Sequence, residues 1–287
     1  MKKASIFSRI GLAALVFNFN AIQLSAYSLK EMLGEERFVP RTDWDNTGIA
    51  PDIKNMAKHT GDIVIAVLSH TVSGSSVLLE AAKRSIEGLS AEEVAKVREE
   101  RVEQEKDVVR DIMKFHTDKD GRFKFSDIGG HGFITPCGFY MEGRAESMRG
   151  SHTLGSNDGS LGLYFVGCYD KDGCEKEGWA VNEVTPEMIE TAAHVVAYYS
   201  LEYGLDIEKQ LAHPELTKEN QENIAFWPRS KLDLAKDRGD RFPHSPGNLI
   251  IERLPEILEK ALVYKAEYLA AQVLLASEKE LVSSEKL

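Results

Sequence analysis

Four histidines in this chain of 287 residues have the side-chain chemistry of a metal site. His70 ends an apolar run, and His131, His152 and His244 follow in three separate polar segments. Three imidazoles around one zinc ion leave a fourth position for water. Zinc bound in this way polarises a carbonyl group and lowers the pKa of its water. If the fold brought three of these rings together, the site could hydrolyse an amide. His59, His194 and His213 are expected to be hydrogen-bonded structural residues.

Polar candidates for ligand binding gather in the stretch from Met141 to Tyr169. The pattern predicts a strand, a polar loop that carries Arg144, His152 and Asn157, and a second strand that is nearly continuous in apolar residues. A polar loop between two buried strands is a place where side chains can meet a ligand while a rigid scaffold holds them.

The motifs in this stretch, and their order, resemble the peptidoglycan recognition and zinc-amidase family. Its members typically show E-G-R, G-x-H, Asn and S-[IL]-G-[IL]-x-F-x-G-x-Y, and this chain has MEGR, GSHTLGSN and SLGLYFVGCY. The resemblance covers roughly Phe38 to Leu262, and includes RTDW, VLSHT, SDIGGHGFI, VTPEMIE and HSPGNLI. It implies a central mixed sheet flanked by helices, with a groove along one face. Members of the family hydrolyse the amide between N-acetylmuramic acid and L-alanine, or only bind muropeptides.

The positions that hold zinc in active members of this family have changed here. Ser69 stands where those members have a His at the end of the central strand, and Ser245 stands before Pro-Gly where they have Cys or Asp. The second ligand would fall in FWPRSKLDLAKDRGDR, which has no His, and Gly130 replaces an assisting Tyr. A serine hydroxyl is a poor zinc ligand beside thiolate or imidazole. His70 should point to the opposite face of its strand from Ser69. The resemblance therefore implies no metal and no cofactor, with zinc only if other residues rebuild a site.

The positions that line the groove in the family are better matched. The residues expected to contact a ligand are His70, Arg144, His152, Thr153 and Asn157. Recognition of a muropeptide also needs a flat apolar wall, for which Trp44 or Tyr140 are candidates. The alternative is that these side chains only brace the loop, and Arg144 in particular matches an arginine that orients it.

Three functions are compatible with these residues. The first is a secreted protein that has an amidase-like fold and binds peptidoglycan or muropeptides without cutting them. The second is an active zinc-dependent N-acetylmuramoyl-L-alanine amidase of cell-wall turnover with shifted ligands. The third is a non-enzymatic interaction protein that docks partners on a long inserted helix near 88–116.

Composition and the N-terminus limit the partners and the location. The formal net charge is −11 and no basic patch is evident, which argues against a nucleic-acid partner. Residues 1–26 have a basic start and an apolar stretch, and end in Leu24-Ser25-Ala26, the pattern of a cleaved signal peptide. The apolar run is short for a bilayer span, so a membrane anchor is the weaker alternative. The chain is expected to be secreted or periplasmic, with no stable membrane span after signal removal.

Strands and helices alternate along the chain, which predicts an α/β fold. The strands are expected at 62–71, 133–134, 138–141 and 161–169, and the helices at 77–86, 90–116, 185–203 and 248–262. One amidase-like domain is expected over 36–262, followed by a helical tail over 263–287.

Three cysteines leave the disulfide pairing open. In an oxidising compartment Cys168 could pair with Cys174, or Cys137 could pair with either one. At least one thiol stays free, because the number is odd.

Overall fold

The structure is a computed structural model that describes residues 27–71, 84–121, 123–153, 157–208, 226–228 and 247–284, with only the backbone described at 226–228. The expected signal peptide, most of the helix expected at 77–86, and Ser245 lie outside these residues.

Six strands form one mixed sheet in this part of the chain, in the order β1-β4-β3-β5-β2-β6. Only the β3–β4 hairpin is antiparallel, and the other neighbours run parallel. The strands are β1 (Phe38–Val39), β2 (Ile65–His70), β3 (Gly132–Ile134), β4 (Tyr140–Glu142), β5 (Ser160–Phe165) and β6 (Phe226–Pro228). The central strands β2 and β5 are buried almost throughout, as their continuous apolar runs predict.

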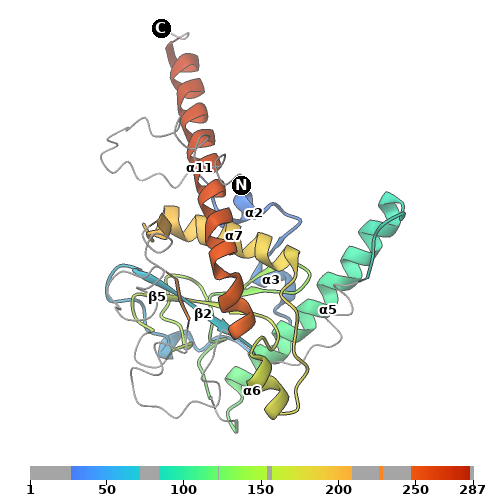
Figure 1. Cartoon of the computed structure of the whole chain (residues 1–287). Helices are drawn as coiled ribbons and strands as arrows, with labels where there is room; N and C mark the ends of the chain where they lie inside the picture. The colour runs from blue at the N-terminus through green and yellow to red at the C-terminus, as the bar shows by residue number, and fades with distance from the viewer. Residues whose placement is uncertain are drawn as a thin grey trace, which may run out of the picture.

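Helices cover both faces of this sheet, so the expected α/β architecture is confirmed (Figure 1). One core cluster joins α2, α7 and α11 to one face, and a second joins α5 and Trp44 to the other. The helices are α2 (Leu29–Leu33), α3 (Arg41–Trp44), α5 (Ala91–Thr117), α6 (Lys171–Lys176), α7 (Pro186–Glu202) and α11 (Asn248–Ser284), with a 3-10 turn at Ile53–Asn55.

Local sequence signals set where the two long central helices begin. Ser90 caps α5 with a reciprocal bond from Glu93, the capping box that the sequence predicts. Thr185 caps α7, and Pro186 takes its first position. The first half of α5 extends away from the sheet (Figure 1).

The C-terminal helix α11 is longer than the sequence indicates. It continues without a break through Leu262, where the domain was expected to end and a tail to begin. The residues on either side of Leu262 pack on α7, because Tyr264 stacks on His194 with ring centroids 3.8 Å apart and Lys260 pairs with Glu190 at 3.0 Å. Among the described helices, none combines the length and the apolarity needed to cross a bilayer.

The cysteine pairing is resolved by proximity. Cys168 and Cys174 form the disulfide, and Cys137 is a free, partly buried thiol. Of the pairings that the sequence left open, the one with the shortest loop is therefore present.

Candidate functional site

The end of β2 separates the two residues that the sequence singles out there. Ser69 is fully buried and is the register partner of Tyr164 on β5. Alternation along the strand places Ser69 on the α5 face and His70 on the α7 face together with Leu68, as expected. The His70 Nδ1 accepts a hydrogen bond from the Tyr169 backbone N–H at 3.1 Å. His70 is thus a buried residue of the opposite face, away from the other expected ligand-binding side chains.

The loop after β4 is closed by Asn157. Its Oδ1 accepts two backbone hydrogen bonds, from His152 N–H at 3.0 Å and from Thr153 N–H at 2.6 Å. His152 is 2% exposed and Thr153 is 1% exposed, whereas Asn157 is partly exposed. The structure therefore brings these three expected residues together, with Asn157 at the surface and His152 beneath it.

His131 supports this loop from below. The ring is 1% exposed, and its Nδ1 accepts a hydrogen bond from the Gly162 N–H at 2.8 Å. That bond places the proton on Nε2, which donates to the Met148 carbonyl at 2.9 Å. Burial lowers the pKa of His131 to about 3, so the ring is neutral at physiological pH. Both nitrogens are used by the fold, and neither is available to a metal.

The rings of His59, His131 and His152 form a row inside the molecule. Their neighbouring centroids are 6.1 Å and 5.6 Å apart. The His59 Nδ1 accepts a hydrogen bond from the Gly159 N–H at 2.9 Å, which ties the far side of the same loop. His59 is a hydrogen-bonded structural residue, as the sequence predicts, and so is His194, whose Nδ1 lies 2.6 Å from the Tyr268 hydroxyl.

Arg144 holds backbone in this structure. It is 3% exposed, and its guanidinium donates to the carbonyls of Ile128 at 2.9 Å, Arg149 at 2.6 Å and Asp127 at 3.1 Å. The bracing role that the sequence left as an alternative therefore describes Arg144. It fixes the segment before His131 to the segment before His152.

An ion pair beneath Arg144 was not found by sequence reasoning. Arg41 of α3 donates two hydrogen bonds to Asp127, at 2.7 and 2.8 Å, and the Asp127 side chain is 2% exposed. Paired burial of this kind anchors a loop, because either charge alone would be costly to bury. Arg41 is the first residue of the RTDW motif, but the sequence does not indicate that Asp127 is its partner.

The two candidates for an apolar wall are core residues. Trp44 is fully buried under α5, where its indole N–H donates to the Glu142 carbonyl at 2.8 Å. Tyr140 is 1% exposed and faces α2 and α7. Both rings are buried, so neither is exposed as a flat apolar surface.

The described residues at these positions do not fit a zinc ion. Ser69 and His70 lie on opposite faces, and the space at Gly130 is filled by the Tyr164 ring, whose Cδ2 would be 2.4 Å from a Cβ there. The described ranges contain no group of three His, Cys, Asp or Glu side chains placed to hold a metal. Ser245 and most of the second-ligand segment lie outside those ranges.

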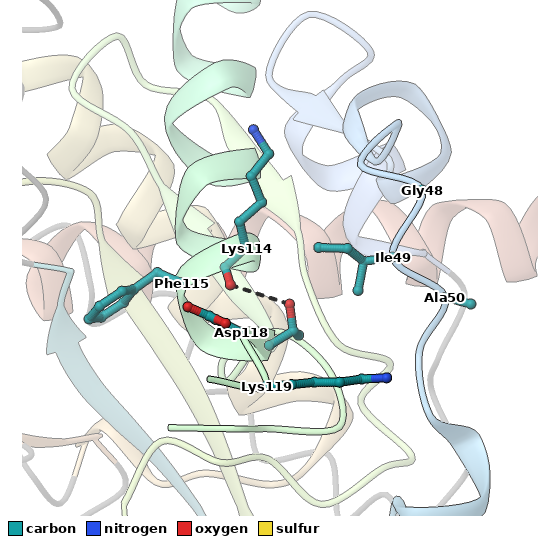
Figure 2. Close-up of a pocket in the computed structure, with 8 residues that line it drawn as sticks. Gly48, Ile49, Ala50, Lys114, Phe115, Asp118 and Lys119 are labelled. Atoms are coloured by element: carbon teal, nitrogen blue, oxygen red, sulfur yellow. Dashed lines mark hydrogen bonds between the residues drawn. The ribbon is translucent and has the colours of Figure 1, made fainter. Parts of the chain in front are cut away.

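A cavity lies elsewhere, between the end of α5 and the loop at 48–50. It has a volume of about 610 Å³ and includes none of the expected site residues in its lining. Figure 2 shows Ile49 pointing from the loop toward the helix, and the Phe115 ring pointing away from Ile49. Lys119 reaches across below Ile49, and Phe115 is 60% exposed.

Part of the chain matches the sequences of known proteins. Peptidoglycan-recognition protein SD of Drosophila simulans is 37% identical over 91 residues, which are 31% of this chain and 47% of that protein. Over this stretch the chain is similar to a peptidoglycan recognition protein. Human peptidoglycan recognition protein 3 is 42% identical over 62 residues, 22% of this chain and 17% of that protein. The chain thus matches about half the length of the Drosophila relative. No family model matches it.

Solved structures of peptidoglycan recognition proteins are also similar. Drosophila PGRP-SD aligns with a TM-score of 0.44 and 21% identity, over 75% of this chain and 92% of that one. Drosophila PGRP-LB aligns with a TM-score of 0.44 and 17% identity, over 76% and 92%. Because both TM-scores are below 0.5, we base the relationship on the sequence matches.

Proposed function

We propose that this protein binds peptidoglycan fragments without hydrolysing them. The observation that supports this proposal is the 37% identity to a peptidoglycan-recognition protein over 91 residues. A segment of that length and identity retains a common fold, and relatives of common fold can keep the binding surface while the chemistry is lost.

The loop from Gly150 to Asn157 is where we place the contact. Asn157 is partly exposed, and its Oδ1 already holds the backbone of His152 and Thr153, so its amide N–H groups are the ones that can turn to a ligand. Muropeptides offer amide and hydroxyl acceptors to such donors. Buried rings hold His152 and Thr153 in place, which lowers the entropy cost of binding at these residues.

The proposal includes binding without zinc or another cofactor. Ser69 supplies a neutral hydroxyl at the strand end, and a hydroxyl is a weak ligand for zinc. We also propose that the protein acts outside the cell or in the periplasm, since residues 1–26 have the pattern of a signal peptide. The net charge of −11 favours a partner other than nucleic acid.

The test is calorimetric titration of the purified protein with a defined N-acetylmuramoyl peptide. We expect saturable binding that survives treatment of the protein with a chelator. In parallel, peptidoglycan is incubated with the protein and zinc, beside an active amidase, and the soluble products are analysed by mass spectrometry. Binding without release of stem peptides supports the proposal. Release of peptides that begin with L-alanine would show a rebuilt metal site, and absence of binding would favour a role for α5 in docking partners.

A further inference from the structure

A second cavity lies on the opposite face of the sheet from Ser69 and His152. Its volume is about 290 Å³, and it is formed by the start of α2, strands β1 and β4, the loop after β4, and α7. Two alternating positions show which face this is, because Tyr140 packs with the α7 core cluster while its neighbour Met141 packs with the α5 cluster. Its lining also includes His131 and Arg144, which support the loop of the proposed peptidoglycan site.

Aromatic rings form the apolar part of this cavity. Phe38 and Tyr140 stack with centroids 5.7 Å apart, and Tyr198 of α7 joins them in the lining. The Tyr140 ring lies against Gly132, where a Cβ would be 2.4 Å from Tyr140 Cε2. Faces of aromatic rings attract cations through their quadrupole.

Two carboxylates complete the lining. One oxygen of Glu146 accepts a hydrogen bond from the Tyr203 hydroxyl, and one oxygen of Glu142 accepts the Arg41 backbone N–H at 3.0 Å. Burial raises the pKa of the Glu146 carboxyl, and the nearby charges of Glu202 and Glu142 raise it further. The carboxylates thus repel one another in a partly enclosed space.

Arg144 and Lys30 of the lining interact with groups other than Glu146. Arg144 donates to three backbone carbonyls, and the charges that affect its pKa are those of Asp127, Arg41 and Tyr164. Lys30 pairs with Glu35 at 3.0 Å on the exposed side of α2. Neither cation neutralises Glu146.

A buried hydroxyl lies behind the same carboxylate. Tyr199 is fully buried, and its hydroxyl makes no hydrogen bond of ordinary length in the described part of the chain. Burial raises the pKa of the Tyr199 hydroxyl, and the neighbouring Tyr140 and Glu146 raise it further.

We propose that this cavity binds a small organic ammonium ion, held by Glu146 and Glu142 and packed against Phe38, Tyr140 and Tyr198. The cation offsets the repulsion between the carboxylates, and its methyl or methylene groups fill the apolar space between the rings. The volume limits the ligand to a few heavy atoms, since ordinary ligand pockets begin near about 300 Å³.

The probe is choline chloride, added to the ¹⁵N-labelled full chain and followed by NMR. Its matched control is 3,3-dimethyl-1-butanol, which has the same shape without the charge, and sodium chloride is kept at equal ionic strength. We expect saturable shifts at Lys30, Phe38 and Ala145 with choline only, with a Kd of about 1 mM for a ligand of this size.

Two variants test whether Glu146 binds the choline cation. Glu146→Gln keeps the shape of the side chain and the acceptor for Tyr203, and should weaken choline binding about tenfold. Glu175→Gln, on the exposed surface of α6, should leave it unchanged. If Glu146→Gln fails to fold, Tyr198→Leu, at a partly exposed position, is expected to weaken binding about fivefold. The proposal is overturned if choline gives no saturable shift, if the neutral alcohol binds equally well, or if a folded Glu146→Gln binds like the parent chain.

Discussion

The imidazole of His152 lies directly against the backbone of Gly162 in β5. A Cβ on Gly162 would be 2.5 Å from His152 Cγ, and a Cβ on Gly150 would be 2.3 Å from His152 Cδ2. The ring therefore occupies a slot between two positions that have no side chain. Its place under the loop depends on both of them remaining glycine.

Gly162→Ala is expected to push the His152 ring out of this slot. Overpacking of this kind lowers the free energy of unfolding by about 1–3 kcal/mol. It should also reduce muropeptide affinity by about tenfold, because the loop held by His152 shifts. Urea unfolding and calorimetric titration measure the two effects. Gly61→Ala is the control, since a Cβ there meets nothing within 4 Å. Parent-like affinity in a folded Gly162→Ala would show that the ring position does not matter for binding.

Asn157→Ala removes the acceptor of two backbone N–H groups, those of His152 and Thr153. We expect muropeptide binding to weaken by about 1–3 kcal/mol, because the ligand acceptors that met the Asn157 amide N–H groups are left without a partner. His152→Ala should have an effect of similar size. Asn157→Asp keeps the acceptor oxygens and is the matched control for loop structure. Unchanged calorimetric affinity in both alanine variants would place the ligand elsewhere.

Glu105 predicts a pH dependence of stability. This fully buried carboxyl of α5 accepts hydrogen bonds from the Thr135 hydroxyl and from the Cys137 backbone N–H at 2.8 Å. Burial raises its pKa from 4.5 to about 7. The folded chain thus retains a proton that the unfolded chain loses between these values, and stability should fall as the pH rises through that window.

The loss is expected to be on the order of 2–3 kcal/mol between pH 4.5 and 7.5. Glu105→Gln should flatten this part of the profile, whereas Glu99→Gln on the exposed side of α5 should leave it as it is. Urea unfolding at a series of pH values measures all three chains. A profile that is the same with and without Glu105 would contradict the assignment.

The disulfide between Cys168 and Cys174 closes a loop with a sequence separation of 6. Replacing both cysteines by Ser should lower the free energy of unfolding by about 2 kcal/mol, from the entropy of the unfolded loop. Cys137→Ala keeps the disulfide and serves as the control for loss of a cysteine. Peptide mapping under non-reducing conditions tests the pairing itself, and a linked peptide that contains Cys137 would contradict it.

Local signals predicted much of the framework correctly. Ser90 and Thr185 mark helix starts because a side-chain oxygen satisfies backbone donors a few residues away, within reach of the sequence alone. The apolar runs at β2 and β5 predicted central strands because a strand buried on both faces needs apolar side chains throughout. Opposite orientations of Ser69 and His70 also followed from strand geometry.

Long-range contacts decided the roles of the site residues. The motif regions contain polar and aromatic residues such as Arg144, His131 and Trp44. Only the fold shows that these side chains form hydrogen bonds with backbone carbonyls and amides. The continuation of α11 past Leu262 depends on its contacts with α7 across about 70 residues of sequence. Composition alone marks a helix there but not its partner.

The sequence by itself determined the family resemblance and the α/β class, because motifs and periodicity are local properties, and it predicts that the matched zinc ligands are lost. Only the tertiary structure decided that His152, Thr153 and Asn157 meet while His70 faces the other layer, and that Glu142 and Glu146 share a cavity with three aromatic rings. The cavity is built from segments far apart in the chain, and the loop contacts, although local in sequence, depend on how the strands and helices hold the loop.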